Sequence, residues 1–458
     1  MKRRWVGLLI AALLAGSIFP QIFAAEATWK AGTAAIKITP QASMWMAGYA
    51  ARNKPSEGIA QDLFAKALAI EDSRGARLVI VTMDLIGVLR PLRDWLESQV
   101  QPQHALEGRW LVINASHTHC GPELRGSKLE GTAAASEQVR LSAEYTEQLQ
   151  QKLLAVVDQA LARLEPAQLD YLHARAGFAM NRRRPTERGF TNAPYSDGPV
   201  DHDVPVLRVT DPQGKKLRAV LFGYACHNTT LSYYKFCGDY AGYAQQYLEE
   251  AHPQVTAMFM AGCGADQNPY PRRSEELVQY HGRTLAVAVE AALETVPRPL
   301  LGPLDAALEE VTLEFAPPPA REELERIAAG KKQPDARHAQ RLLKELEQTG
   351  KIRSTYAYPI QAIRFGSELT MVALAGEVVV DYSLRLKREL AGPAVWIAGY
   401  SNDVFGYVPS HRVLKEGGYE GGDAMRNTSL PGPFAPSVED RIISRALQLA
   451  RRPLAQAP

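Results

Sequence analysis

The chain alternates between short apolar segments and longer amphipathic ones, and this alternation narrows the choice of folds. Helical periodicity is clearest in residues 143–164 and 274–295, and further helices are predicted for residues 378–390 and after Ser437. Six segments are apolar over almost their whole length, as expected of strands covered on both faces; they are residues 78–85, 110–115, 220–225, 255–261, 369–375 and 395–398. The sequence therefore predicts an α/β fold in which helices flank a mixed β-sheet core.

The domain organisation follows from composition along the chain. Residues 317–351 begin with PPPAREELERIAAGKK and stay highly charged, which predicts a solvated helical hairpin inserted between strands. The sequence contains neither an internal repeat nor a low-complexity linker. We therefore expect a single large catalytic domain over residues 26–458, with residues 317–351 as an insertion.

The N-terminus carries the pattern of a secretory signal peptide. Cations at positions 2–4 precede an apolar stretch at residues 5–19, and small residues follow at Ala24 and Ala25. The apolar stretch is shorter than the roughly 20 residues that span a bilayer, so an uncleaved anchor is the less favoured alternative. We expect residues 1–25 to be removed on export to a periplasm or to the outside of the cell.

Composition limits the class of partner. The full chain is 46% hydrophobic and 22% charged, with a formal net charge of +2, and loss of the three signal-peptide cations leaves −1. These values are typical of a soluble globular protein. We expect no nucleic-acid partner and no obligate protein partner.

Four cysteines remain after the predicted cleavage, at Cys120, Cys226, Cys237 and Cys263. Four cysteines allow three pairings, and an oxidising compartment favours disulfides, so we expect one disulfide without choosing the pair. A thiolate zinc site is the alternative, but exported thiols tend to oxidise.

Polar clusters follow the predicted strands. They read NASHTHCG, YACHNTT, AGCGADQNP, LAGE and AGYSND. In open α/β sheets, ligands bind outside the carboxyl ends of the strands. The five clusters therefore predict one shared site.

Histidines in these clusters are candidate zinc ligands. His117 and His119 are two residues apart, so on an extended backbone both imidazoles face one side, and one could bind metal while the other transfers protons. The alternative is a structural, hydrogen-bonded pair. His227 could join His117 on a metal, since catalytic zinc typically has three protein ligands. Glu377 could complete a His/His/Glu set or simply stabilise the start of a helix.

Other residues are candidates for substrate contact. Residues 399–420 are rich in Tyr, Gly and Asn, as in functional loops, and Tyr407 and Tyr419 are its candidates; alternatively both tyrosines fill the core. Asp266 could orient a histidine or cap the turn after it. Arg182, in MNRRRP, could hold a carbonyl oxygen or belong to a solvated basic patch.

Taken in order, these segments resemble the N-terminal catalytic domain of the neutral, non-lysosomal ceramidases. The specificity lies in their order over several hundred residues, not in any one segment. The resemblance covers most of the mature chain and rests on AGTAAIKITP, MAGYAAR, GIAQDLFAKALAIED, INASHTHCGP, MNRRRP, YACHNTT, CGADQNP, LAGE and GYSNDVFGYVPS.

The resemblance implies one zinc ion per chain. The positions that match the family's zinc ligands are His117, His227, Glu377 and Tyr407. The positions that match residues which position or polarise substrate are His119, Arg182 and Tyr419. Asn268 stands where the family has a serine near the scissile bond, and we expect a short form without the family's C-terminal immunoglobulin-like domain. Both departures bear on the substrate more than on the metal chemistry.

The expected function is zinc-dependent hydrolysis of the amide bond of ceramide-like lipids by an activated water, with transient contact to a membrane surface. Arg182 or Tyr419 would stabilise the oxyanion, and His119 would move the proton to the leaving amine. A second hypothesis keeps the metal but assigns another acyl substrate, such as an N-acyl amino compound. A third is a non-catalytic binding protein. A lipid substrate requires an apolar groove beside the metal, whereas a polar pocket would favour the second hypothesis.

Overall fold

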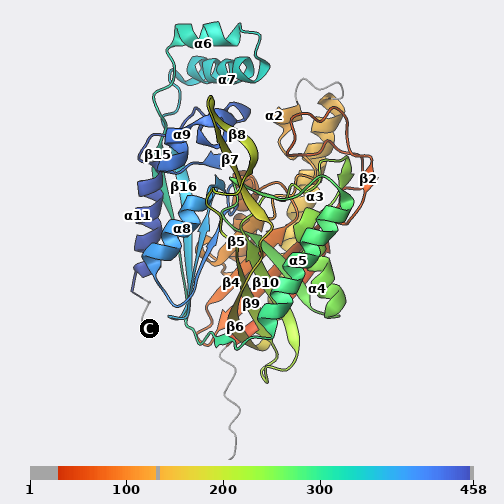
Figure 1. Ribbon diagram of the computed structural model, residues 1–458. Coiled ribbons are helices and arrows are strands. Elements are labelled where there is room, and N and C mark those ends of the chain that lie inside the picture. Colours follow the sequence, from red (N-terminus) through yellow and green to blue (C-terminus); the bar gives the residue numbers. More distant parts are fainter. Residues whose placement is uncertain (1–28, 130–134, 454–458) are drawn as a thin grey trace, which may run out of the picture.

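The computed structural model describes residues 29–129 and 135–453, and the predicted signal peptide lies outside them. Figure 1 shows two β-sheets in the middle of the molecule, with α3, α4 and α5 on one side and α8 and α11 on the other. The predicted α/β class is confirmed. The six predicted strands all form, but they belong to two sheets instead of one.

The larger sheet contains nine strands within the described ranges. In spatial order they are β12 (Thr256–Ala261), β10 (Leu217–Tyr224), β9 (Asp203–Thr210), β6 (Glu165–Arg175), β1 (Trp29–Lys37), β3 (Phe64–Asp72), β4 (Arg77–Met83) and β5 (Leu111–Ala115), with β14 (Arg298–Pro299) pairing with β6. The pairs β10–β12 and β4–β5 are parallel, and the other pairs are antiparallel.

The smaller sheet has the order β15 (Leu304–Glu314), β16 (Thr355–Phe365), β17 (Leu369–Leu374) and β19 (Val395–Ala398). The parallel pair is β17–β19. Short ribbons lie near the strand ends; they are β7 (Ala179–Thr186) with β8 (Gly189–Tyr195) and β13 (Gln267–Pro269), β18 (Glu377–Val378) with β20 (Tyr407–Val408), and β2 (Gly58–Ile59) with β11 (Lys235–Phe236).

The helices differ in position: α3, α4 and α5 pack on the larger sheet, α8 and α11 pack on the smaller one, and α6 and α7 project away from both. They are α1 (Arg90–His104), α2 (Gly126–Leu129), α3 (Ala135–Ala162), α4 (Asp239–Ala251), α5 (Glu275–Leu293), α6 (Arg321–Ala328), α7 (Gln333–Thr349), α8 (Val380–Leu390), α9 (His411–Glu416), α10 (Gly418–Gly421) and α11 (Val438–Arg451), with 3₁₀ turns η1 (Gly108–Trp110) and η2 (Asp423–Asn427). Among the described residues, no helix combines the length and apolar character that crossing a bilayer requires.

Three apolar cores hold these layers together. One lies between the larger sheet and its helices, and it includes Leu153 of α3 and Val278 of α5. A second lies between the smaller sheet and helices α8 and α11. The third lies between the sheets, where Ile80 and Leu221 share a cluster with Met371 and Trp396. Strands covered on both faces explain why the six segments are apolar without alternation.

Helices α6 and α7 form a hairpin that projects from the body (Figure 1). The hairpin connects β15 to β16, whose ends meet where Glu314 pairs with Thr355. Leu324, Ala339 and Leu342 form a small core of its own. The hairpin is therefore a local unit placed at one end of the smaller sheet.

The predicted disulfide is wrong, because all four cysteines are buried free thiols. Cys263 belongs to the core behind the smaller sheet, whereas the other three belong to the core behind the larger one. Cys237 lies beside Cys120, but its Sγ accepts a hydrogen bond of 3.3 Å from the backbone N–H of Asp239. The thiols serve as packing groups in this fold.

Candidate metal centre

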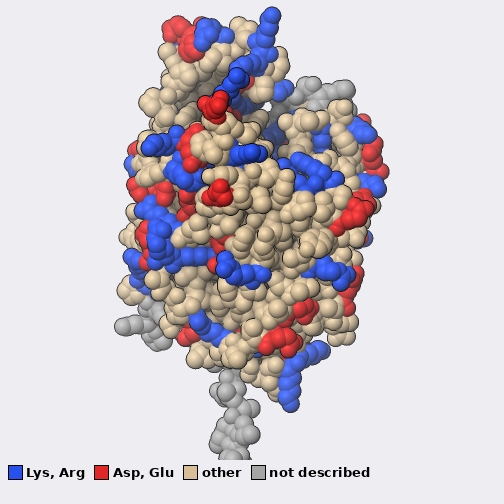
Figure 2. Space-filling model, in the orientation of Figure 1, with Lys and Arg blue, Asp and Glu red and all other residues tan. Residues whose placement is uncertain are grey.

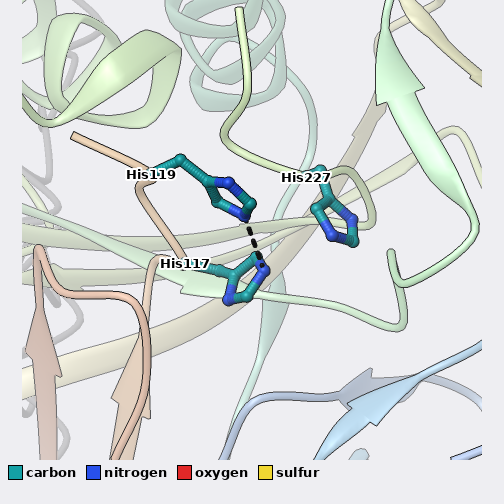
Figure 3. A group of neighbouring side chains, drawn as sticks. All are labelled: His117, His119 and His227. Carbon is teal, nitrogen blue, oxygen red and sulfur yellow. Dashed lines mark hydrogen bonds between the residues drawn. The ribbon is translucent and has the colours of Figure 1, made fainter. Parts of the chain in front are cut away.

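Three histidines from two strand ends meet at one point (Figure 3). His117 and His119 follow β5, and His227 follows β10. Their ligand atoms all lie within 4.8 Å of one another. A bridge between Thr118 and Asn228 joins the two loops, so the convergence is built into the backbone.

The backbone at His117 differs from the extended form that the sequence predicted. His117 has φ of 62°, in the left-handed region that non-glycine residues rarely adopt. Its N–H donates to the carbonyl of Leu85 at 3.0 Å, which helps to hold this conformation. Residues in such conformations cluster at functional sites. The two imidazoles of the HTH motif face one centre through this local twist.

Two of the imidazoles are oriented by backbone carbonyls. His117 Nδ1 donates to Ile86 O at 2.6 Å, and His227 Nδ1 donates to Gly264 O at 2.7 Å. A proton on Nδ1 leaves the Nε2 lone pair of each ring free to bind a metal. Metal-binding histidines in proteins usually have such a partner on the second nitrogen.

Glu377 completes a set of convergent acceptors. Its Oε2 lies 3.2 Å from His117 Nε2 and 3.4 Å from His227 Nε2. Among the described residues, no donor satisfies this buried oxygen. Burial alone would raise the pKa of Glu377, but the two neighbouring imidazoles hold that pKa well below its usual range. A cation bound between these three atoms would satisfy all of them, and a set of nitrogen and oxygen donors suits zinc.

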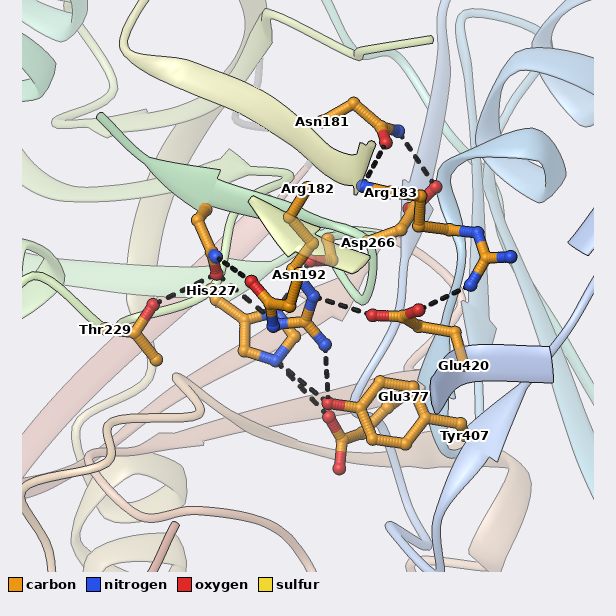
Figure 4. Close-up of polar contacts among 12 residues, drawn as sticks. Asn181, Arg182, Arg183, Asn192, His227, Thr229, Asp266, Glu377, Tyr407 and Glu420 are labelled. Atoms are coloured by element: carbon orange, nitrogen blue, oxygen red, sulfur yellow. Dashed lines mark hydrogen bonds and ion pairs between the residues drawn. The ribbon is translucent and has the colours of Figure 1, made fainter. Parts of the chain in front are cut away.

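Tyr407 lies next to Glu377 because the ribbon β18–β20 pairs these two residues directly. Its hydroxyl is 3.3 Å from His227 Nε2 and accepts a hydrogen bond of 2.9 Å from Arg182 Nη2 (Figure 4). Burial raises the pKa of Tyr407 well above its ordinary value, although Arg182 lowers it. The structure thus brings together the four residues that match the family's zinc ligands.

Arg182 is buried and is not part of a solvated basic patch. Only 5% of the residue is exposed. Nε donates to Glu420 Oε1 at 2.8 Å, and Nη1 donates to Asn268 Oδ1 at 3.3 Å. Burial would lower the pKa of Arg182, but Tyr407 and Glu420 hold it well above its ordinary value. A fixed positive charge therefore lies beside the Tyr407 hydroxyl.

His119 lies at the open side of the centre. Its Nε2 is 3.1 Å from His117 Nε2, and its ring stacks edge-on against Tyr49 with centroids 4.8 Å apart. Burial lowers the pKa of His119 well below its ordinary value, and the charges of His117 and His227 lower it further. Gly48 has φ of 96°, and a Cβ there would lie 2.4 Å from the His119 ring. Glycine at this position is what allows the ring to be placed.

Asp266 lies in the turn after β12, and Asn268 lies in the strand β13 that follows this turn. Asp266 Oδ1 accepts from the N–H of Val380 at 2.9 Å, which caps the start of α8, and Oδ2 accepts from Asn181 at 3.1 Å. Within the described part of the chain, the hydrogen bonds of Asp266 reach no histidine. Burial raises the pKa of Asp266 to about 6. Asp266 thus stabilises the architecture, whereas Asn268 contacts Arg182.

Residues 29–268 match the family model described as neutral/alkaline non-lysosomal ceramidase, N-terminal. The match covers more than half of the chain. The chain belongs to this ceramidase family. A search of curated proteins found no match.

Solved ceramidase structures share the fold. The chain is similar to the crystal structure of neutral ceramidase from Pseudomonas aeruginosa, with a TM-score of 0.72 and 19% identity, over 94% of this chain and 77% of that one. It is also similar to a ceramidase complexed with C2, with a TM-score of 0.71 and 19% identity over the same shares. At this level of identity the likeness shows the fold.

In this ceramidase-family chain, Tyr419 lies in the wall of a cavity beside the candidate metal centre. Tyr419 is 44% exposed and therefore does not fill the core, whereas Tyr407 is buried, with 7% of its surface exposed. The two rings are 5.2 Å apart. The cavity has a volume of about 320 Å³, and Tyr49 also lines it. Because Tyr49 packs on His119, the cavity opens beside the candidate ligands.

Sequence reasoning did not single out Asn114, Tyr400 or Glu420. Asn114 accepts from the N–H of Ala261 at 2.8 Å and donates to Gly399 O at 2.8 Å, which joins three strand ends. Tyr400 has φ of 49° and its ring lies 4.5 Å from that of His117. Asn114 and Tyr400 lie inside two of the polar clusters that follow strands, and this was the available signal. Their partners could not be inferred from one chain.

Proposed function

We propose that the chain is a zinc-dependent hydrolase that cleaves the amide bond of ceramide-like N-acyl lipids. The observation that supports zinc is the unsatisfied Oε2 of Glu377, which faces the Nε2 atoms of His117 and His227. Family membership supports an amide bond of a lipid as the target. Tyr407 would be the fourth ligand.

When bound, zinc would lower the pKa of a coordinated water to about 7 and polarise the substrate carbonyl. The residues around the zinc site would transfer the proton and stabilise the oxyanion. His119 is neutral at pH 7, because its pKa is low, and can accept a proton and pass it to the leaving amine. Arg182 holds the Tyr407 hydroxyl, and Tyr419 presents its side chain to the cavity, where it can donate to a developing oxyanion.

The test compares the purified chain with His117→Ala and Glu377→Gln. His252 and Glu290 form a surface ion pair of 2.9 Å away from the centre, so His252→Ala and Glu290→Gln are matched controls. We expect one zinc per chain and hydrolysis of N-acyl lipids in the wild type and both controls. Both site variants should lose zinc, and turnover should fall at least about 100-fold, since removing a first ligand exceeds the 10–100-fold effect of its supporting partners.

Two results would contradict the proposal. Equal turnover by the wild type and the site variants would exclude the metal mechanism. A wild type that retains no zinc under non-chelating conditions, yet still binds N-acyl lipids, would indicate a binding protein on this scaffold.

We also propose that residues 26–458 are exported as one catalytic domain that contacts membrane surfaces briefly to reach its lipid. The N-terminal pattern of cations, apolar residues and alanines supports export. N-terminal sequencing of the chain from the exported fraction should begin near Glu26. A chain found in the cytoplasm and beginning at Met1 would contradict export.

A further inference from the structure

The cavity beside the metal centre has an unusual lining for a lipid site. Its lining includes a few apolar residues, namely Trp45, Met46, Ala50 and Pro334. Within the described ranges, five cations line it, against one carboxylate, that of Glu123. The cations are Arg52, Lys128, Arg337, Arg341 and Arg426. In Figure 2, Lys and Arg side chains border the hollow that separates the α6–α7 hairpin from the rest of this face.

The single carboxylate does not balance these charges. Glu123 Oε1 and Oε2 accept hydrogen bonds from Arg125 at 2.6 and 2.7 Å, so Arg125 neutralises the charge of Glu123. Arg426 pairs with Asp335 at 3.1 Å and with Asp423 at 2.7 Å, which neutralises that arginine. Among residues 29–129 and 135–453, Arg52, Lys128 and Arg337 form no ion pair with a carboxylate, so these three cations give the cavity wall an excess of positive charge.

Arg52 and Arg341 are fixed by backbone groups. Arg52 donates to Tyr233 O at 3.0 Å, and Arg341 donates to Thr428 O at 3.1 Å. Carbonyl oxygens satisfy the N–H groups of a guanidinium without cancelling its charge. Arg52, which forms no ion pair with a carboxylate among the described residues, consequently holds positive charge in place at the wall of the cavity.

Lys128 of α2 and Arg337 of α7 both line the cavity. Among residues 29–129 and 135–453, no carboxylate forms an ion pair with either side chain. Partial withdrawal from water and the neighbouring Arg125 lower the pKa of Lys128 to about 8. Pro334, Arg337 and Arg341 share one face of α7 near its N-terminus, where the helix dipole adds positive potential.

We propose that this cavity binds an anionic head group on the amine side of the substrate, so that the preferred substrates are lipid amides with a carboxylate beside the amide, such as N-acyl amino acids. The inference rests on the proposed amide hydrolysis. Ceramide presents only hydroxyl groups on its amine side, and these would leave the cations without counter-charge. The sparse apolar lining fits a head group better than an acyl chain.

The experiment uses a matched pair of substrates, N-lauroylglycine and its neutral counterpart N-lauroylglycinamide, with release of laurate as the readout. Arg337→Gln is the test variant, and Lys344→Gln, on α7 but outside the cavity lining, is the control. We expect Arg337→Gln to raise KM for N-lauroylglycine about tenfold, because a charge-assisted hydrogen bond is worth about 1.5–3 kcal/mol. KM for the neutral amide, and both KM values of Lys344→Gln, should stay unchanged.

Binding separates this inference from the proposed function. Calorimetric titration of N-lauroylglycine should show tighter binding to wild type than to Arg337→Gln, with a difference that shrinks at high salt. Equal KM changes for both amides, or ceramide hydrolysed with no preference for the carboxylate amide, would overturn the anionic site while leaving amide hydrolysis intact. Charge-selective binding without hydrolysis of any amide would support the anionic site and contradict the proposed function.

Discussion

Around Glu377, three buried atoms that can accept a hydrogen bond face one another: its Oε2 and the Nε2 atoms of His117 and His227. The two imidazoles donate their Nδ1 protons to backbone carbonyls, so each presents a lone pair to the Glu377 oxygen. Unpaired buried acceptors are costly, about 1–3 kcal/mol each and more when charged. A cation bound among them would remove this cost, which is why single residues here carry functional information.

At the scale of single residues, the proposed roles of Tyr407 and Tyr419 can be distinguished by substitution. Tyr407→Phe removes a hydroxyl that lies 3.3 Å from His227 Nε2, so zinc affinity should fall at least about tenfold. Tyr419→Phe removes a hydroxyl from the cavity wall, and we expect turnover to fall while zinc affinity stays within about twofold of wild type. Zinc titration of both variants checks this. Equal loss of zinc by both would contradict the separation of roles.

Asp266 should make stability depend on pH. Its pKa is raised from 3.8 to about 6, so between pH 4 and pH 6 the folded chain binds more protons than the unfolded chain, and stability falls as the pH rises. A shift of about two units corresponds to about 3 kcal/mol. Asp266→Asn lacks this titration, so the stability of wild type relative to the variant should fall by about that amount between pH 4 and pH 7. Denaturant unfolding at both pH values measures it; a difference independent of pH would contradict it.

Among the elements, the α6–α7 hairpin contributes residues to the wall of the cavity and none to the candidate metal centre. Its helices share a small core apart from the main cores, while Arg337 and Arg341 of α7 line the cavity. The charged composition of residues 317–351 predicted two solvated helices. Their position over the cavity depends on contacts with η2, including the ion pair between Asp335 and Arg426, and could not be inferred from composition.

Removal of the hairpin tests this separation. Phe315 N–H donates to Ser354 O at 2.9 Å, so residues 317–351 can be replaced by an Asn-Gly turn that continues the β15–β16 pairing. We expect full zinc binding and a nearly unchanged unfolding temperature. KM for N-lauroylglycine should rise at least about tenfold, because one cationic wall is lost. Loss of zinc in this deletion would show that the hairpin supports the metal centre itself.

For the whole molecule, the packing of two sheets decides where the site forms. Asn114 of β5 pairs with Ser401 after β19, and Gly262 after β12 pairs with Ala398 of β19, so strand ends of the two sheets are joined directly. The sequence predicted the strands and their polar ends. It did not predict that Glu377 and Tyr407 come from a different sheet than the histidines.

The same packing isolates the four cysteines. Titration with a thiol reagent should detect four thiols in denaturant and none in the native chain, because all four side chains are buried and free. The intact mass should be the same before and after reduction. Detection of only two thiols in denaturant would contradict this and restore the original expectation of one disulfide.

The sequence by itself determined the α/β class, the apolar strands and the polar residues at their ends, because burial on both faces and strand termination leave local patterns. The tertiary structure alone decided that the strands divide between two sheets, that His117 adopts a left-handed backbone, and that the cations of α2 and α7 surround one cavity. These features arise from contacts between residues far apart in the chain, and such contacts leave no local pattern to read.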